Sequence, residues 1–465
     1  MVFSSMFFLF LFLVATLAVY FLVPARYLRA RNLVLLVTSL FFYFFGEPVG
    51  ILLMLVSIVG NYFAARFLAA GRHEKAWLAA AVVLNLAMLG TFKYADFFVT
   101  NFNALTGLSL PLPGFAMPIG ISFFTFQGLS YVLDVYRRRV PAQRDLINVA
   151  TYISMFPQLV AGPIVRYETV AAELDCRHET LSRAADGAQR FIYGLAKKML
   201  LSNAMGEIAT AIFANDAAQL SAPLAWTGAA AYTFQIFFDF SGYSDMAIGL
   251  GHIFGFTFPE NFNYPYISRS ITEFWRRWHM SLSTWFRDYV YIPLGGSRCG
   301  MARQILNILI VWTLTGLWHG AAWNFVIWGL YFALLLTLEK LFLLRLLERI
   351  PRFAGHIYAV FFILLGWVLF NSPSLSYAGA YCAALFRAPD TAWEVGQALY
   401  FLRQYLPEWA LCVLFSLPVA PWLRQRFAGR AWYAPTVTAV AAVLFLLSLL
   451  SVVSSSFNPF IYFRF

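Results

Sequence analysis

The sequence has 465 residues, of which 61% are hydrophobic and 12% are charged. Soluble domains are roughly 45–50% apolar and about 25% charged, so the charged side chains are too few to cover a water-soluble protein of this length. The net charge of +11 would suit a nucleic-acid-binding protein, but the basic residues gather in short loops between apolar runs. The composition therefore predicts one helical membrane domain that does not bind nucleic acid.

Residues 1–136 predict five membrane-spanning helices joined by short loops. A helix needs about 20 predominantly apolar residues to cross the hydrocarbon core. Uncharged runs of this kind occupy Met6–Val23, Asn32–Gly46, Pro48–Ala65 and Ala76–Phe92. No Lys or Arg precedes the first run and no small-residue cleavage pattern follows it, so we interpret it as a span rather than a cleaved signal peptide.

Residues 137–338 are apolar stretches interrupted by polar and charged residues, and simple spans return at 353–463. Ionisable groups at membrane depth are costly and indicate function by default. We therefore predict a catalytic core at about 115–340, simple spans at 1–114 and 353–457, and an aromatic C-terminal tail at 458–465. All of them would belong to one integral membrane domain, 1–465.

The basic residues predict the topology. Clusters of Arg and Lys follow the first, third and fifth runs, and further clusters lie near 345–352 and 424–430. Cytoplasmic loops carry an excess of Lys and Arg, so both termini are expected on the outer side of a bacterial inner membrane. The four cysteines are widely scattered, with no spacing typical of a metal site.

His319, in Gly316-Leu317-Trp318-His319-Gly320, is the first candidate catalytic residue. The flanking glycines indicate close helix packing or a break in the helix. A neutral histidine is a suitable general base for a hydroxyl proton, and burial keeps a histidine neutral. The alternative is a structural imidazole bonded to a backbone carbonyl.

The segment from Asn263 to Tyr289 is rich in Trp and Arg. As one helix it would carry an apolar Trp stripe, with Arg276 and His279 on another face. One interpretation is an amphipathic helix at the headgroup boundary. In the other, arginines hold the phosphates of an acidic cosubstrate, because a guanidinium binds phosphate with two hydrogen bonds; the candidates are Arg276, Arg277 and Arg287.

Two carboxylates, Asp239 and Asp245, stand six residues apart in an apolar context. They suit a proton or cation site, a polar break between spans, or, with Asp288, a supporting network around the arginines. The Pro- and Gly-containing segments 118–123 and 156–164 are interpreted as kinks or re-entrant turns enclosed by protein.

Together these segments resemble the membrane-bound O-acyltransferase family, in particular its bacterial alginate O-acetyltransferase-type branch. The resemblance runs along the whole chain and rests on residues 1–5, 118–126, 156–164, 238–246, 275–296 and 316–320. It implies a ring of tilted helices with re-entrant segments around a central tunnel. It also implies that His319 is the essential histidine and His279 the second one.

The resemblance further implies the reaction and its partners. The donor would be acetyl-CoA, as a cosubstrate and with no bound cofactor or metal. The acetyl group would pass outward to a periplasmic acetyltransferase with an SGNH-hydrolase-like fold, which would place it on an exopolysaccharide. The nearest rival is D-alanyl transfer to teichoic acid. A proton-coupled transporter or flippase using Asp239, Asp245 and His319 is a second alternative.

The C-terminal tail, Asn458-Pro459-Phe460-Ile461-Tyr462-Phe463-Arg464-Phe465, is short and aromatic. It resembles the tail of a small accessory protein of D-alanylation systems. This predicts that Tyr462 enters the tunnel from outside and carries the acetyl group as a phenolic ester. The alternative is an interfacial aromatic anchor that ends the last span.

Overall fold

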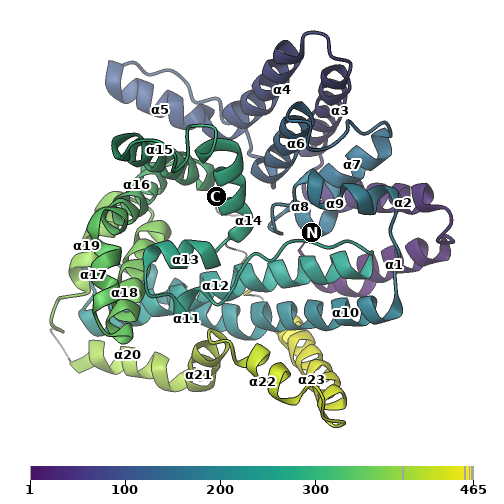
Figure 1. The fold of residues 1–465 in the computed structure, drawn as a ribbon. Coiled ribbons are helices and arrows are strands. Elements are labelled where there is room, and N and C mark those ends of the chain that lie inside the picture. Colours follow the sequence, from purple (N-terminus) through teal and green to yellow (C-terminus); the bar gives the residue numbers. More distant parts are fainter. Residues whose placement is uncertain (1, 390–391, 455–456, 460, 462–465) are drawn as a thin grey trace. The chain divides into compact units, whose positions relative to one another are not determined.

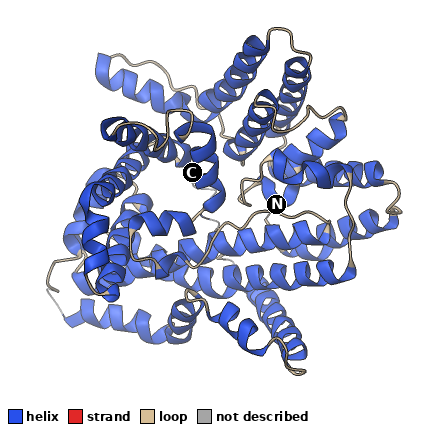
Figure 2. Cartoon of the chain, in the orientation of Figure 1, coloured by secondary structure: helices blue, strands red, loops and turns tan. Residues whose placement is uncertain are grey.

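The computed structural model describes residues 2–389, 392–454, 457–459 and 461. Within these ranges the chain forms helices joined by loops and turns, without a β-strand (Figure 2). The predicted all-α class is confirmed. The chain divides into two compact units, one of Met1–Phe191 with Tyr243–Pro259, the other of Ile192–Gly242 with Glu260–Phe465.

The first unit consists mainly of the N-terminal helices, coloured purple to blue in Figure 1. They are α1 (Leu13–Leu22), α2 (Leu28–Gly46), α3 (Gly50–Ala69), α4 (Glu74–Leu89), α5 (Ala95–Thr106), α6 (Ile121–Tyr136), α7 (Leu146–Ser154), α8 (Phe156–Leu159) and α9 (Tyr167–Asp175). Helix α3 packs against α4 and α6, and α2 packs against α7. Helices α10 (Leu181–Ala196) and α12 (Ala222–Ile253) contribute residues to both units.

Polar side chains and a glycine bring α3, α4 and α6 together. Asn61 and Asn85 are fully buried and exchange two amide hydrogen bonds, of 2.8 and 3.2 Å, between α3 and α4. A Cβ atom on Gly128 of α6 would lie 2.4 Å from the Asn61 amide nitrogen, so only glycine fits there. Small residues and interhelical amide bonds are typical of helix packing in membranes, where apolar side chains gain little by leaving lipid.

The two segments rich in Pro and Gly meet in the first unit. Gly120 precedes α6 with a φ of 77°, a left-handed conformation that glycine adopts readily. A Cβ atom on Gly120 would lie 2.9 Å from the carbonyl oxygen of Leu159, at the end of α8. This close contact supports the structural interpretation of both segments.

The second unit contains the helices coloured teal, green and yellow from α11 onward in Figure 1, together with part of α12. They are α11 (Asn203–Phe213), α13 (Ile271–Arg277), α14 (Met280–Phe286), α15 (Met301–His319), α16 (Trp323–Leu338), α17 (Leu344–Arg349), α18 (Arg352–Asn371), α19 (Leu375–Ala384), α20 (Ala392–Gln404), α21 (Leu406–Phe415), α22 (Val419–Phe427) and α23 (Tyr433–Ser454). Helices α15 and α16 pack closely. A Cβ atom on Gly316 would lie 2.3 Å from the Phe325 carbonyl oxygen, and one on Gly329 2.2 Å from that of Trp312.

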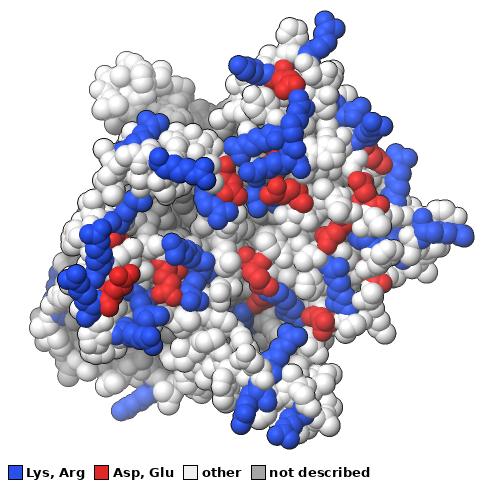
Figure 3. Space-filling view, in the orientation of Figure 1, with Lys and Arg blue, Asp and Glu red and all other residues white. Residues whose placement is uncertain are grey.

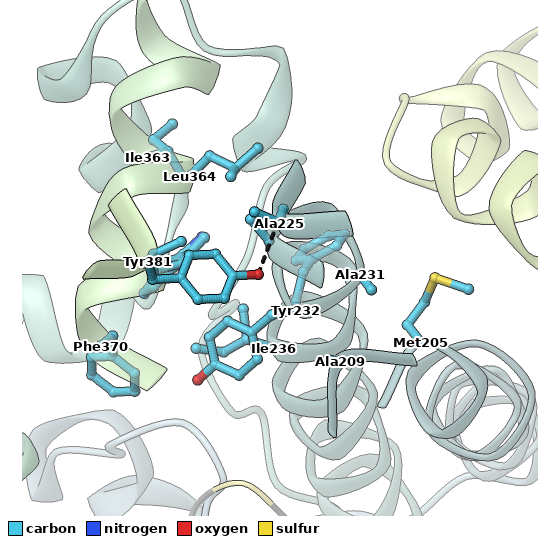
Figure 4. Close-up of a cluster of buried hydrophobic side chains, with 14 of the residues drawn as sticks. Met205, Ala209, Ala225, Ala231, Tyr232, Ile236, Ile363, Leu364, Phe370 and Tyr381 are labelled. Atoms are coloured by element: carbon cyan, nitrogen blue, oxygen red, sulfur yellow. Dashed lines mark hydrogen bonds between the residues drawn. The ribbon is translucent and has the colours of Figure 1, made fainter. Parts of the chain in front are cut away.

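Aromatic and aliphatic side chains form the core of the second unit. Figure 4 shows Tyr232 and Ile236 of α12 beside Tyr381 of α19. The Tyr381 hydroxyl, which is fully buried, donates a 2.9 Å hydrogen bond to the Ala225 carbonyl oxygen. This bond satisfies the one polar atom that Tyr381 brings into the core.

Six described helical segments are long and apolar enough to cross a membrane: Leu28–Gly46, Gly50–Ala69, Glu74–Thr106, Trp323–Arg349, Arg352–Asn371 and Tyr433–Ser454. The pair α21 and α22, bent by 65°, is a further candidate. The polytopic architecture is thus confirmed. Two of the five spans expected before residue 137 do not have the length of a full span. Phe7–Leu22 is shorter, and α6 has 16 residues that are almost entirely buried in protein.

Candidate active site

His319 is the last residue of α15, so the predicted break in the helix occurs at this histidine. Gly320 follows in an extended conformation. A Cβ atom on Gly320 would lie 2.2 Å from the Phe325 ring, so a larger residue would collide there. The chain therefore turns sharply after His319 and leaves the imidazole at a helix end inside the protein.

Aromatic rings surround His319, which is 8% exposed. Its ring centroid lies 5.1 Å from that of Trp328 and 5.4 Å from that of Phe370, both nearly perpendicular to it. Trp318 lies 5.0 Å away in the same way. Close packing of this kind fixes the ring plane.

His279 lies between two short helices rather than on one long helix. Helix α13 ends at Arg277 and α14 begins at Met280, with His279 in a left-handed conformation at φ 45°. The predicted single helix, with Arg276 and His279 on a common face, is therefore wrong. The break buries His279 to 1% exposure and leaves Arg276 exposed.

The two histidines share a buried, aromatic environment. The Phe240 ring lies 4.6 Å from that of His279, and the Trp318 ring lies 6.0 Å from His279 and 5.0 Å from His319. Burial lowers the pKa of His279 well below its usual value, and the neighbouring His319 lowers this pKa further. His279 is therefore neutral at physiological pH.

Asn261 determines which nitrogen of His279 carries the proton. Its Oδ1 atom accepts hydrogen bonds from the backbone N–H and the hydroxyl of Ser281, of 3.3 and 2.9 Å. The same oxygen lies 3.0 Å from Nδ1 of His279. Because an amide oxygen only accepts, Nδ1 carries the hydrogen, and Nε2 of the neutral ring keeps a lone pair.

Asp239 is held by a lysine and by the C-terminal tail. Its Oδ1 atom lies 2.6 Å from Nζ of Lys198, and both side chains are at most 4% exposed. Its Oδ2 atom accepts a 2.9 Å hydrogen bond from the backbone N–H of Ile461. Lys198 also donates to the Pro459 carbonyl oxygen, and Asn203 donates to that of Phe457 at 3.2 Å. Two side chains, Lys198 and Asp239, thus bind the described part of the tail, and Asn203 binds the residue that precedes it.

A small cavity of about 20 Å³ connects these elements. It is lined by Asp239, His319 and Ile461 together with the aliphatic or aromatic residues Ile236, Phe240, Trp278, Trp328, Trp367 and Phe370. A cavity of this size holds about one water molecule. The tail therefore reaches the cavity of the candidate catalytic histidine. Tyr462, the predicted acyl carrier, lies outside the described residues.

The other predicted site residues lie elsewhere. Arg276, Arg277 and Arg287 do not line the cavity. Arg277 pairs with Glu273 at 3.0 Å, and Arg287, whose side chain is 59% exposed, pairs with Asp288 at 2.7 Å.

The predicted network of aspartates and arginines forms only in part. Of the three aspartates, Asp288 has one of the predicted arginines as its partner. Asp239 pairs with Lys198, and Asp245 pairs with Arg190 in the first unit at 2.9 Å.

Sequence reasoning missed Lys198 and Asn261. Lys198 stands in a Lys197-Lys198 pair flanked by apolar residues, and lysines in such a context are a signal of function that could have been used. Asn261 carries no comparable signal, because its contact with His279 spans 18 residues and depends on the turn that the chain makes between them.

The chain is similar to known acyltransferases along its whole length. The model of the membrane-bound O-acyltransferase family matches residues 137–379. A probable alginate O-acetylase of Azotobacter vinelandii is 40% identical over all of both chains. A peptidoglycan O-acetyltransferase of Helicobacter pylori is 34% identical over 81% of this chain and 78% of its own.

A further similarity covers less of the chain. A teichoic acid D-alanyltransferase of Bacillus subtilis is 34% identical over 48% of this chain and 59% of its own. The family match covers the segment that holds both histidines, and the full-length relatives extend it to the remaining helices. The chain therefore belongs to the membrane-bound O-acyltransferase family and is a multi-pass membrane O-acyltransferase.

Proposed function

We propose that this protein takes an acetyl group from acetyl-CoA at the cytosolic face of the bacterial inner membrane and passes it across the membrane. The acetyl group would serve the O-acetylation of an exopolysaccharide such as alginate, or of another extracytoplasmic glycan. The names of the relatives that match most of the chain, an alginate O-acetylase and a peptidoglycan O-acetyltransferase, support both the acyl group and the kind of acceptor.

The observation that carries the proposal is the tail in the histidine cavity. Ile461 lines the same cavity as His319, and its backbone N–H is bonded to Asp239. Tyr462 follows Ile461 directly in the sequence. The C-terminal tail follows the last apolar helix and reaches a buried histidine. This position suits an acyl carrier that works at the outer side of the membrane.

The transfer step would form one bond and break one. The phenolic oxygen of Tyr462 attacks the thioester carbonyl carbon, a C–O bond forms, the C–S bond breaks, and CoA leaves as a thiol. His319 takes the phenol proton as general base and returns a proton to the leaving sulfur. His279 lies close by as a second neutral imidazole. An aryl ester retains much of the transfer potential of a thioester, so the acetyl group can then pass to a hydroxyl acceptor.

Transfer outside the membrane would need a partner. With both termini outside, as the positive-inside rule predicts, the tail would meet a periplasmic acetyltransferase of SGNH-hydrolase-like fold. That partner would move the acetyl group from Tyr462 to the polysaccharide. Arg276 and Arg287 are exposed and remain candidates for contact with the phosphates of the donor.

The test is the acetyl-ester content of extracted exopolysaccharide and cell wall from cells with matched membrane levels of each variant. His319→Ala should abolish the esters of one glycan pool, which identifies the acceptor. The matched control is His356→Ala, which removes a half-buried histidine that bonds the Ser268 carbonyl and does not line the cavity. Unchanged esters in every pool would refute acetyl export and favour D-alanyl transfer, which D-alanine release from the cell wall would detect.

A second test concerns the carrier. Tyr462→Phe keeps the ring and removes the hydroxyl, so acetyl export should be lost while the protein remains in the membrane. Mass spectrometry of the C-terminal peptide from a wild-type protein with an inactive acceptor system should show one added acetyl group. Normal export by the phenylalanine variant would refute the relay and leave the tail as an anchor.

A further inference from the structure

The first unit contains an open cavity of about 620 Å³ with basic walls. Four of its lining residues are arginines: Arg66, Arg138, Arg139 and Arg144. The other lining residues are small or apolar: Ala69, Ala70, Val135, Val140, Pro141 and Ala142. Figure 3 shows Lys and Arg side chains crowded over the region of α3 and α6. The wall comes from the end of α3, the end of α6 and the loop that follows α6.

The positive charge of the cavity is only partly compensated by the protein. Arg138 pairs with Glu74 at 2.5 Å, and Arg139 lies 3.8 Å from Glu168. Arg66 and Arg144 form no ion pair with any described residue. Like charges that line one cavity repel one another, so an anion bound in the cavity would lower the energy of this arrangement.

Arg138 also occupies a strained backbone position. Helix α6 ends at Tyr136, and Arg138 has a φ of 59°. Its N–H bonds the Val135 carbonyl, and the N–H of Arg139 bonds that of Asp134. These two bonds form a Schellman motif, whose left-handed position usually holds glycine because a side chain there is unfavourable. An arginine at this position makes the folded backbone less stable than glycine would, and ending the helix does not require an arginine.

The positive-inside rule explains why basic residues lie in this loop, but not why they face one cavity. That rule depends on the number of Lys and Arg near the ends of spans. It does not require an arginine in a position that favours glycine, nor small residues that leave the space open. Strained residues that persist are a reason to look for function.

We propose that this cavity binds a phosphate-bearing anion, at a site separate from the histidine cavity. Guanidinium groups bind phosphate with paired, charge-assisted hydrogen bonds. Two sources share this chemistry on the side of the membrane where basic loops are expected: the phosphates of CoA and the headgroup of an anionic phospholipid. Binding here does not depend on the acyl-transfer chemistry proposed above.

The experiment uses the full-length protein in nanodiscs of phosphatidylcholine. Isothermal titration with CoA tests the soluble source. Native mass spectrometry of phosphatidylglycerol retained after extraction from mixed bilayers tests the lipid source. In Arg66→Gln/Arg144→Gln, CoA binding or phosphatidylglycerol retention should weaken by roughly 10-fold or more.

The matched control is Arg424→Gln/Arg426→Gln, which removes the same charge from two exposed arginines of α22. A loss confined to CoA identifies the soluble source, and a loss confined to phosphatidylglycerol identifies the lipid source. If the test pair and the control pair behave alike in both measurements, the proposal is wrong.

Arg138→Gly separates a binding role from a structural one. Glycine adopts the left-handed backbone conformation without strain, so the unfolding temperature of Arg138→Gly should be equal to or higher than that of the wild type. If Arg138 binds the anion, Arg138→Gly should weaken binding of the same probe, CoA or phosphatidylglycerol, that the Arg66→Gln/Arg144→Gln variant binds less well. This loss should occur although the backbone of Arg138→Gly is less strained. A stabilised Arg138→Gly protein with wild-type binding of both probes would contradict the proposal.

Discussion

At the residue scale, two buried histidines lie in one aromatic environment, and different contacts hold each of them. His319 ends a helix at a position where the next residue must be glycine. His279 depends on a break between two helices and on the Asn261 amide. A general base must keep a lone pair available, and burial favours the neutral imidazole, which has one.

His279 should make the stability of the protein depend on pH. Its folded-state pKa is lowered, so below the unfolded value of about 6.5 the unfolded chain binds more protons than the folded one. The free energy of unfolding should therefore decrease as pH falls below that value, until the folded-state pKa is reached. We expect the unfolding temperature in detergent to fall less on acidification in His279→Gln than in the wild type.

The control for this prediction is His178→Gln, which changes an exposed histidine. It should keep the full pH dependence of the wild type. An equal loss of stability on acidification in the wild type and in His279→Gln would show that other groups cause the dependence.

At the element scale, the close packing of α15 on α16 positions His319. Gly316→Ala would place a methyl group 2.3 Å from the Phe325 carbonyl oxygen, so the helices must move apart. Overpacking typically costs about 1–3 kcal/mol, and here it also displaces the end of α15. We expect a lower unfolding temperature and a large loss of acetyl esters.

Gly379→Ala is the matched control, because nothing lies within 4 Å of a Cβ atom at Gly379 in α19. Alanine in a helix interior is favoured over glycine by about 0.5–1 kcal/mol. This variant should be as stable as the wild type or more so, with full activity. Equal behaviour of the two glycine variants would contradict the role of the close contact.

The C-terminal tail should depend on the pair of Lys198 and Asp239. Lys198→Met leaves a buried carboxylate without its cation, which typically costs about 3–5 kcal/mol. Lys198→Met/Asp239→Leu should recover most of the unfolding free energy, because an apolar pair can replace a buried ion pair. Acetyl export should stay low in both variants, because Lys198→Met removes the anchor of Pro459 and the double variant also removes that of Ile461. A double variant with full export would refute this role.

At the scale of the whole molecule, the charge pattern predicts which loops face the cytosol. Helix α18 separates the basic cluster around Arg349 from the turn at Pro373, and both residues are exposed. In a variant without the four free cysteines, Pro373→Cys should react with a membrane-impermeant maleimide in intact spheroplasts. Arg349→Cys should react only after permeabilisation. The reverse pattern would invert the proposed orientation.

The sequence by itself determined the all-helical, membrane-spanning class and predicted the segment that holds the candidate catalytic residues. Apolar runs of span length and the scarcity of charge leave few alternatives in a bilayer, since backbone polar groups must be satisfied within helices. The family resemblance then predicted His319 and His279 as the catalytic residues. These signals are local, because each is contained in one stretch of the chain.

Only the tertiary structure decided the partners of these residues. Lys198 with Asp239, Asn261 with His279, and Ile461 in the His319 cavity join positions far apart in the chain. Periodicity reports which face of a helix is apolar, but a break such as that at His279 changes the direction of every residue after it. Side-chain contacts between distant segments arise from packing, and packing is a property of the folded chain as a whole.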